Sequence, residues 1–237
     1  MNSLLLVFFA MFGDCRTDTL VSSDGSRAAL VVPVRTRQAK TPKLPLVIWL
    51  HGGIGANNPA KGLTAAQGFT KWADSGGFAL LTPSAWPASP WWSLTAKARL
   101  QELVEKASKV PGVGTRVIVL AGVSDGGSGA LWLAEQLRGT WGKRLKGVAI
   151  WSSDPSVMAS QGIPFDLSAL KGLPVRWMAG QRDHLYPFED VASWWDRARA
   201  NGVVLEPLSD PTADHDLSFH QQDLGRFPKW LRSLATP

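Results

Sequence analysis

The stretch AGVSDGGSGALWLAEQL, residues 121–137, places a serine between two structural patterns. The preceding RVIVLAGV is a β-branched apolar segment typical of a buried strand, and the following residues have the apolar spacing of a helix. Ser124 lies at the junction, with Gly122 two residues before it and Gly126 two residues after it. Side chains at these two positions of a tight turn would collide with neighbouring backbone, which glycine avoids. The pattern predicts that Ser124 is presented as a nucleophile.

A second glycine-rich stretch, HGGIG at residues 51–55, ends the apolar segment LVIWL. Glycines in such a loop let the backbone approach a reacting carbonyl group. A backbone N–H from Gly53 or Ile54 would pair with the N–H of Asp125, which follows the serine, to give the two donors that a tetrahedral intermediate needs. The ring of His51 is expected to bond the loop and not to transfer protons.

Strand-like and helix-like segments alternate along the rest of the chain. Strands are expected at 19–23, 27–34, 44–52, 78–85, 116–123, 145–153, 174–180 and 203–208. Helices are expected at 64–75, 95–109, 127–138, 188–200 and 221–234. This alternation predicts an α/β fold with a mostly parallel sheet of about eight strands and helices on both faces. Because no repeat or linker interrupts it, residues 19–237 are expected to form a single domain.

The HGG loop and the GVSDGG turn, in this succession of strands and helices, resemble the α/β-hydrolase superfamily over nearly the whole chain. Within it, the chain is similar to compact carboxylesterases, dienelactone-hydrolase-like enzymes and secreted polyester or feruloyl esterases. The strands at 145–153 and 174–180 are separated by only about 20 residues, which leaves no room for a large helical cap. The resemblance implies a serine esterase that cleaves carboxylic esters through an acyl-enzyme.

The resemblance also implies an acid and then a histidine, in that order, after the serine. Asp183, in GQRDHLYPFED, follows the strand at 174–180 and is similar in position to the usual acid of the family. His215, in SDPTADHDLSFH, is the expected base. In this scheme the histidine takes the proton of the serine hydroxyl, and the carboxylate fixes the tautomer of the histidine and stabilises its charged form.

Three other residues compete for these roles. His220 is the alternative base, although it lies at the expected start of the last helix. Asp154 follows the strand at 145–153, a position that some relatives use for the acid. His184 adjoins Asp183, and neighbours on an extended loop generally point apart. Two alternative functions also remain: an acyltransferase on the same triad, and a non-catalytic binding protein that keeps the fold.

Tryptophan is unusually frequent, with twelve residues against one tyrosine. Three of the twelve lie in PSAWPASPWWSL, residues 83–94, on a loop expected to leave the same sheet edge as Ser124. Ligands bind at that edge of an open parallel sheet. Trp86 and Trp92 are therefore predicted to contact the substrate as an acyl or aromatic wall, and the alternative is that they pack against a helix.

Composition limits the partners. The chain carries 25 Lys and Arg against 19 Asp and Glu, a net charge of +6, but the basic residues are scattered, so we expect no nucleic-acid binding. Its single cysteine, Cys15, rules out an internal disulfide and any multi-cysteine metal site. We expect no metal and no cofactor, and the expected partner is a small-molecule or polymeric ester.

The N-terminal residues suggest export. Residues 4–12 form an apolar run that is too short to span a bilayer as a helix, so no integral membrane span is expected. The run has the length of a signal-peptide core, although no Lys or Arg precedes it. Cys15 resembles a lipoprotein anchor, but Asp14 departs from the small residue of that pattern. We interpret residues 1–18 as a possible signal or lipoprotein-like segment of a periplasmic, secreted or lipid-anchored protein. The alternatives are a buried first strand or a misplaced start, in a cytoplasmic protein.

Overall fold

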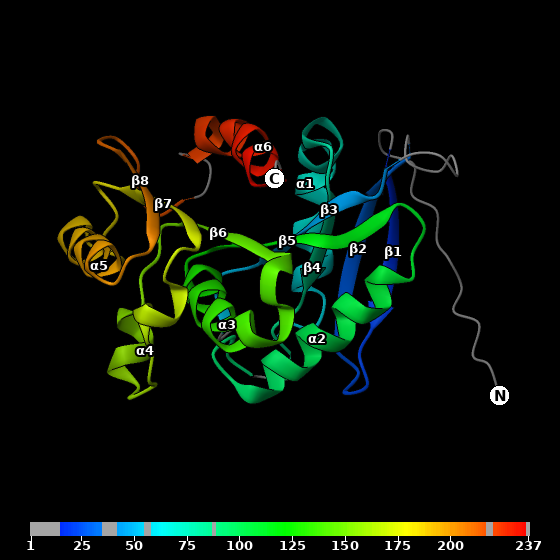
Figure 1. Ribbon diagram of the computed structural model, residues 1–237, viewed down its shortest axis with the longest axis horizontal. Coiled ribbons are helices and arrows are strands. Elements are labelled where there is room, and N and C mark those ends of the chain that lie inside the picture. Colours follow the sequence, from blue (N-terminus) through cyan, green and yellow to red (C-terminus); the bar gives the residue numbers. More distant parts are fainter. Residues whose placement is uncertain (1–14, 35–41, 55–57, 87–88, 217–219, 236–237) are drawn as a thin grey trace.

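The protein is described here by a computed structural model that covers residues 15–34, 42–54, 58–86, 89–216 and 220–235. Its centre is one sheet of eight strands in the order β1-β2-β4-β3-β5-β6-β7-β8 (Figure 1). The strands are β1 (Cys15–Val21), β2 (Arg27–Pro33), β3 (Leu44–Leu50), β4 (Ala79–Pro83), β5 (Val113–Val123), β6 (Leu145–Trp151), β7 (Pro174–Gly180) and β8 (Val204–Asp210).

The sheet is parallel from β4 through β3, β5, β6 and β7 to β8, and antiparallel where β1 pairs with β2 and β2 with β4. The central strands are apolar along their length, as in LPLVIWL of β3, because both faces of a parallel sheet are covered. The expected mostly parallel sheet is confirmed. The carboxyl ends of the parallel strands lie at one edge, where Ser124 follows β5.

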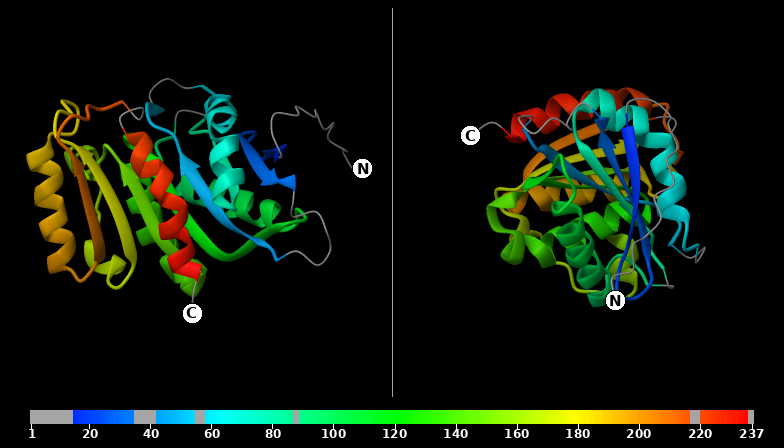
Figure 2. Two further views of the ribbon diagram at one scale, coloured as in Figure 1. Left: turned by 90° about the horizontal axis from the view of Figure 1, so that it is seen from above. Right: turned by 90° about the vertical axis from the view of Figure 1, so that its right-hand side faces the viewer.

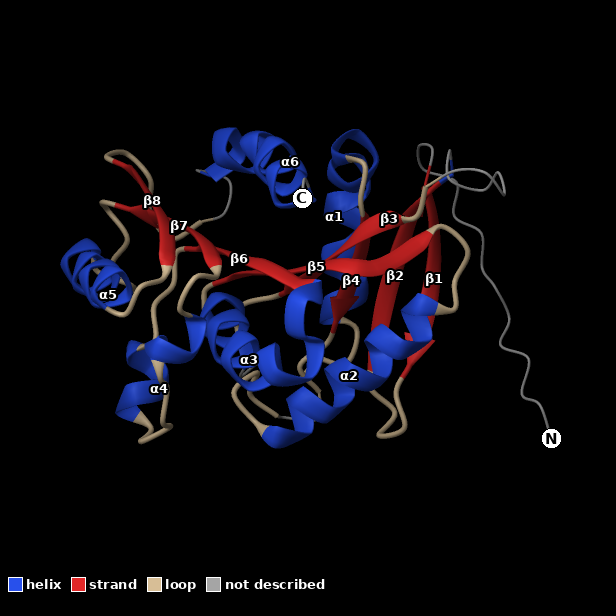
Figure 3. Cartoon of the chain, viewed as in Figure 1, coloured by secondary structure: helices blue, strands red, loops and turns tan. Residues whose placement is uncertain are grey.

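Helices cover both faces of the sheet (Figures 1 and 2). The main helices are α1 (Lys61–Gly76), α2 (Leu94–Ser108), α3 (Asp125–Trp141), α5 (Phe188–Ala200) and α6 (Gln221–Ala235). Side chains of α1 and α6 pack in one apolar core, and those of α2, α3 and α5 pack in the other. Figure 3 shows the resulting three layers, with the strands between the two groups of helices.

Four of the tryptophans, Trp49, Trp72, Trp151 and Trp230, belong to the core between the sheet and the pair α1 and α6. Trp49 of β3 lies 5.5 Å from Trp151 of β6 and 5.8 Å from Trp72 of α1, measured between ring centroids. Trp72 also contacts Phe227 of α6, at 4.9 Å. Large aromatic side chains bury much apolar area per residue, so this cluster stabilises one whole face of the sheet.

The first strand begins earlier than expected, at Cys15 instead of residue 19. Cys15 pairs with Pro33, so β1 runs along the whole of β2, and the boundary expected at residue 18 lies inside β1. The Cys15 side chain is buried, and its Sγ donates to the Thr70 carbonyl oxygen at 3.5 Å. The expected export signal at residues 1–14 lies outside the described residues.

The connection from β6 to β7, residues 152–173, holds only the short helix α4 (Ser156–Ser160) and the 3-10 turn η4 (Leu167–Leu170). A further 3-10 turn, η3 (Gly142–Arg144), precedes β6. The expected lack of a large cap is confirmed. Within the part of the chain that the structure describes, no helix has both the length and the apolar character needed to cross a membrane.

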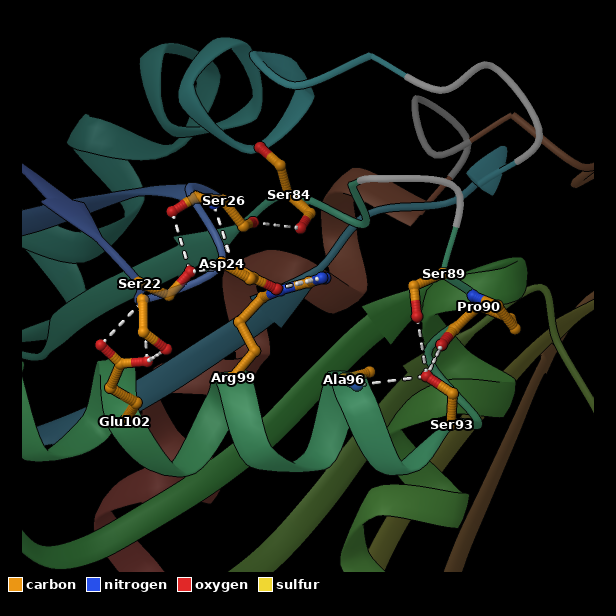
Figure 4. Close-up of polar contacts among 11 residues, drawn as sticks. Ser22, Asp24, Ser26, Ser84, Ser89, Pro90, Ser93, Ala96, Arg99 and Glu102 are labelled. Carbon is orange, nitrogen blue, oxygen red and sulfur yellow. Dashed lines mark hydrogen bonds and ion pairs between the residues drawn. The ribbon is translucent and has the colours of Figure 1, made fainter.

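Figure 4 shows how the turn between β1 and β2 is fastened to α2. Asp24 accepts hydrogen bonds from Arg99 Nε at 2.8 Å and Arg99 Nη2 at 2.6 Å. The Arg99 side chain is 2% exposed, so this carboxylate compensates a buried positive charge. Burial raises the pKa of Asp24, but the hydrogen bonds from Arg99 and Ser22 outweigh burial and hold it below its usual value.

Removing this carboxylate should destabilise the fold. Asp24→Ala should lower the free energy of unfolding by about 2 kcal/mol, because Arg99 stays buried without its partner. The matched control is Asp196→Ala. Asp196 forms an ion pair with Arg199 at the surface, where the two side chains are 80% and 51% exposed. Its replacement should lower the free energy of unfolding by less than about 0.5 kcal/mol. Urea unfolding measures both, and equal losses would contradict the assigned role of Asp24.

Candidate active site

Ser124 occupies a strained turn between β5 and α3. Its φ is 55° and its ψ is −131°, outside the conformations that residues with side chains usually adopt. A Cβ atom at Gly122 would overlap the Gly126 carbonyl, and one at Gly126 would overlap the Leu50 carbonyl at the end of β3. Both glycines are thus required by close backbone contacts, as the sequence pattern predicts.

The end of β6 holds this turn from the other side. The Ser124 N–H donates to the Trp151 carbonyl at 3.1 Å, and the Ser153 hydroxyl donates to the Ser124 carbonyl at 2.7 Å. Ser152, between these two residues, also has a positive φ, of 45°. The backbone of the serine is therefore fixed between β3 and β6, so its side chain projects from a rigid support.

The structure brings the three expected residues together. His215 Nε2 lies 3.1 Å from Ser124 Oγ, and His215 Nδ1 lies 3.0 Å from Asp183 Oδ2 and 3.2 Å from Asp183 Oδ1. With the ring proton on Nδ1, the imidazole donates to the carboxylate and accepts from the serine hydroxyl. Such a chain can remove the serine proton as the oxygen attacks a carbonyl carbon.

The loop after β7 orients Asp183, the expected acid. Asp183 is 5% exposed, and its Oδ1 accepts from the N–H groups of Leu185 at 2.9 Å and Tyr186 at 3.0 Å. Burial raises the pKa of Asp183, but hydrogen bonds from His215 and Tyr186 outweigh burial and hold it below its usual value. The hydrogen bond to Asp183 raises the pKa of His215, against the opposing effect of burial. Asp183 therefore stays ionised and strengthens the histidine as a base.

Tyr186 lies against His215, the expected base. Its ring is stacked on that of His215, with centroids 5.6 Å apart and planes inclined by 12°. Burial, followed by the charge of Asp125, raises the pKa of Tyr186 to about 12, so its hydroxyl stays protonated at neutral pH. No pattern in the sequence marks this residue; its one signal is that it is the only tyrosine of the chain, three residues after the expected acid.

The HGG loop runs beside the serine. A Cβ atom at Gly52 would lie 2.8 Å from Ser124 Cβ, and Gly53 has a φ of 59°. The Ile54 N–H donates to Asp125 Oδ2 at 3.1 Å and so already has a partner within the protein. Of the two candidate donors in the loop, the N–H of Gly53 therefore fits an oxyanion better, together with the N–H of Asp125 at the start of α3.

The ring of His51 bonds the HGG loop, as expected. Its Nε2 accepts from the Ala85 N–H at 3.1 Å, which places the ring proton on Nδ1, 2.9 Å from the Gly52 carbonyl. Burial lowers the pKa of His51 to about 4, so the ring is neutral. The His51 carbonyl accepts from Trp91 Nε1 at 2.9 Å.

The competing residues have other partners. His220 is 1% exposed, and its Nε2 lies 2.7 Å from Ser152 Oγ. Asp154 Oδ1 accepts from the Ser156 N–H at 2.6 Å. His184 Nδ1 lies 3.1 Å from Asp214 Oδ1, at the surface. None of the three has a hydrogen bond with Ser124 or His215 within the described residues, so the geometry favours Asp183 and His215.

Ser124 and His215 open into a cavity of about 840 Å³. Its apolar wall comes from Val157 of α4 and from Leu185, Tyr186 and Pro187 before α5. These positions carried no recognisable pattern in the sequence. Among the described residues, no group of three or more His, Cys, Asp or Glu side chains could hold a metal ion.

The tryptophan loop does not supply this wall. Trp92 is 4% exposed, and its Nε1 donates to Gln161 Oε1 at 2.9 Å. Trp86 is half-buried, and neither residue lines the cavity. Trp92 packs in the core beside Trp91, which lies close to Gly129 of α3. The contact of Trp86 and Trp92 with the substrate stays a prediction.

No protein-family model matches the sequence, and no curated protein matches it. Solved structures do resemble the fold. A fungal esterase of Rhizomucor miehei has a TM-score of 0.71 at 14% identity over 93% of this chain and 82% of its own. An S-formylglutathione hydrolase of Agrobacterium tumefaciens has a TM-score of 0.66 at 15% identity over 92% and 94%. A hyperthermophilic esterase of Pyrobaculum calidifontis has a TM-score of 0.67 at 16% identity over 94% and 86%. The chain has the α/β-hydrolase fold.

The close contacts of the serine turn can be tested with two glycines of α3. Gly126→Ala should lower the free energy of unfolding by about 3 kcal/mol or prevent folding, because its Cβ would overlap backbone of β3. Gly139→Ala, which meets no atom within 4 Å, should be neutral or raise the free energy of unfolding by about 0.5–1 kcal/mol. Thermal and urea unfolding compare the variants; a well-tolerated Gly126→Ala would contradict this account of the turn.

Proposed function

We propose that this protein is a serine hydrolase that cleaves carboxylic esters through an acyl-enzyme on Ser124. The observation that carries the proposal is the hydrogen-bonded chain from Asp183 through His215 to Ser124, with contacts of 3.0 and 3.1 Å, at the wall of an open cavity. The esterases and the S-formylglutathione hydrolase of similar fold support the reaction class.

In the first half-reaction, Ser124 Oγ attacks the ester carbonyl carbon while His215 Nε2 takes the hydroxyl proton. The charge that forms on the carbonyl oxygen is stabilised by the N–H groups of Gly53 and Asp125. His215 then passes its proton to the leaving alcohol, and the C–O bond of the ester breaks. In the second half-reaction, water loses a proton to His215 and attacks the acyl carbon. The bond between that carbon and Ser124 Oγ then breaks, His215 returns the proton to Ser124 Oγ, and the acid is released.

The environment of each group fits its step. The strained turn keeps Ser124 Oγ at the cavity surface, and the backbone around it is held by β6. Asp183 stabilises the imidazolium that forms when the proton moves, since the carboxylate is buried and already accepts two backbone N–H groups. The short β6–β7 connection leaves the site open to esters of bulky or polymeric acids and alcohols.

The nucleophile is tested by Ser124→Ala. This change should lower ester turnover by about 10⁴-fold or more and abolish labelling by a fluorophosphonate, while thermal unfolding stays close to that of the parent protein. Turnover of p-nitrophenyl butyrate and mass mapping of the labelled peptide measure the two effects. Undiminished turnover by the variant, or label on a different serine, would reject the mechanism.

The pH dependence tests the base. Only the neutral form of His215 accepts the serine proton, so kcat/KM should rise with pH through the pKa of this residue. That pKa is raised from the ordinary value of 6.5 by Asp183, so the midpoint of the rise should lie above 6.5. His215→Gln should abolish activity, whereas His220→Gln should keep both activity and midpoint. A profile that moves only with the change at His220 would transfer the role to that residue.

A further inference from the structure

One residue contacts all three members of the proposed triad. Tyr186 lies in the loop between β7 and α5, is 9% exposed and lines the cavity beside Ser124. Its backbone N–H donates to Asp183 Oδ1 at 3.0 Å, and its ring is stacked on the ring of His215. Its hydroxyl forms hydrogen bonds at the serine turn, with Ser128 and Ser124. Tyr186 therefore links the loop that carries the proposed acid to the helix that follows the proposed nucleophile.

The ring of Tyr186 faces the imidazole of His215. The two ring planes are inclined by 12° and the centroids lie 5.6 Å apart, a separation that is typical of stacked aromatic pairs. The face of a phenol ring carries partial negative charge and attracts a cation that lies within about 6 Å of its centroid. On the proposed mechanism, the imidazole becomes such a cation when it takes the proton of Ser124. The stack therefore favours the charged form of His215 over the neutral form.

Several charged groups act on the same histidine. The hydrogen bond to Asp183 raises the pKa of His215, burial lowers it, and the charges of Asp183, Asp214 and Asp125 raise it. Three further ionisable groups lie nearby: His184, which is paired with Asp214, Asp216 on the cavity wall, and His220, whose pKa is lowered by burial. All of these groups remain when only Tyr186 is replaced, and so does the backbone N–H that binds Asp183. A change in the titration of His215 would then report the loss of the ring.

The hydroxyl of Tyr186 fixes the ring in place. Burial raises the pKa of Tyr186 to about 12, so the phenol stays protonated at neutral pH. Its partner Ser128 is buried in α3, where Ser128 Oγ donates to the Asp154 carbonyl oxygen at 2.6 Å. Since a hydroxyl oxygen has two lone pairs, Ser128 can accept from the phenol. The ring is thus held between this hydroxyl and the backbone N–H that binds Asp183, and the imidazole stacked on the ring is held with it.

We propose that Tyr186 is a positioning residue of the candidate active site. Its ring keeps the imidazole of His215 in line with Ser124 and stabilises the charged form of the imidazole, and its hydroxyl anchors the ring to α3. The inference rests on the proposed function, in which His215 is the base. Tyr186 acts through His215 and transfers no proton itself. Another side chain of similar size would fill the same space, but only an aromatic face favours the imidazolium.

Two substitutions separate the aromatic face from the volume of the side chain. Tyr186→Met fills most of the space without a ring, so the midpoint of the rise in kcat/KM with pH should lie about 0.5 pH unit lower. In the same variant kcat should fall about tenfold, because the base is less well placed. Tyr186→Phe keeps the face, so its midpoint should equal that of the parent protein, and kcat should fall no more than about threefold for the lost hydroxyl. KM for p-nitrophenyl acetate should change little in both variants, since this ester is too small to depend on the cavity wall.

Leu185→Ala is the matched control. Leu185 precedes Tyr186 in the chain, is 59% exposed and lines the same cavity, but it has no aromatic face. Its replacement should raise KM for esters with a long acyl chain and leave the midpoint of the pH profile unchanged. Equal shifts of the midpoint in Leu185→Ala and Tyr186→Met would overturn the proposal, because any change of the wall would then produce them.

A second measurement does not depend on turnover. NMR titration of the Cε1–H signal of His215, assigned by its loss in His215→Gln, should give a lower midpoint in Tyr186→Met than in the parent protein. Where Tyr186→Met does not fold, phenylalanines with one, two and three ring fluorines take its place at position 186. Fluorine keeps the shape of the ring and weakens its negative face, so the midpoint should fall with each fluorine. Thermal unfolding checks that each variant is folded.

The outcomes separate this inference from the proposed function. An unchanged titration of His215 in Tyr186→Met, or across the fluorinated series, would overturn the role of the ring and leave the esterase activity in place. Equal losses of kcat in Tyr186→Phe and Tyr186→Met, with an unmoved midpoint, would assign the effect to the hydroxyl and also overturn that role. A lower midpoint of His215 in a protein that cleaves no ester and takes no fluorophosphonate label would confirm that the ring stabilises the imidazolium and overturn the proposed function.

Discussion

The arrangement of the site depends on close contact between the backbone of the serine turn and the ends of two strands. At Gly126, α3 approaches the last carbonyl of β3 so closely that no side chain fits between them. On the other side, the Ser124 N–H is bonded to the end of β6. These contacts fix the strained backbone of Ser124, and the same end of β3 continues into the HGG loop. The proposed nucleophile and the proposed oxyanion donors therefore share one rigid support.

Three partly or fully buried histidines show how neighbours decide the role of a residue type. Burial lowers the pKa of His51 and of His220, and each ring bonds an uncharged group, so both are neutral and structural. His215 is also partly buried, but its hydrogen bond to Asp183 raises its pKa. The difference is one carboxylate held by the loop after β7. On the proposed mechanism, that loop makes a base of one histidine and not of the others.

The sequence predicts best what depends on local chain geometry. The glycines around Ser124 and the strand and helix on either side are local signals, and the structure has the turn they indicate. Asp183 and His215 could be placed only through the order of residues in similar proteins, because 32 residues separate them along the chain. Their hydrogen bond depends on two loops that meet at the sheet edge.

What the sequence could not predict depends on contacts between distant segments. Trp91 packs against Gly129 of α3, and its Nε1 donates to the His51 carbonyl. These contacts join segments that are far apart in the sequence, so no local pattern indicates them. The choice between the N–H groups of Gly53 and Ile54 depends on the side chain of Asp125, which lies 71 residues away from Ile54. The strand at Cys15 was hidden because its residues, CRTDTLV, are mixed in polarity, and pairing with β2 determines their conformation.

Asp125 contributes to the candidate site through both its backbone and its side chain. Its backbone N–H begins α3 and is one of the two proposed oxyanion donors, while its carboxylate binds the Ile54 N–H and fastens the HGG loop to the serine turn. The same carboxylate adds negative charge next to the oxygen that those donors serve. A neutral side chain would fasten the loop with a weaker hydrogen bond, since bonds to a charged acceptor are stronger. The loop is therefore held firmly, and the proposed oxyanion donors are fixed together with the turn that carries Ser124.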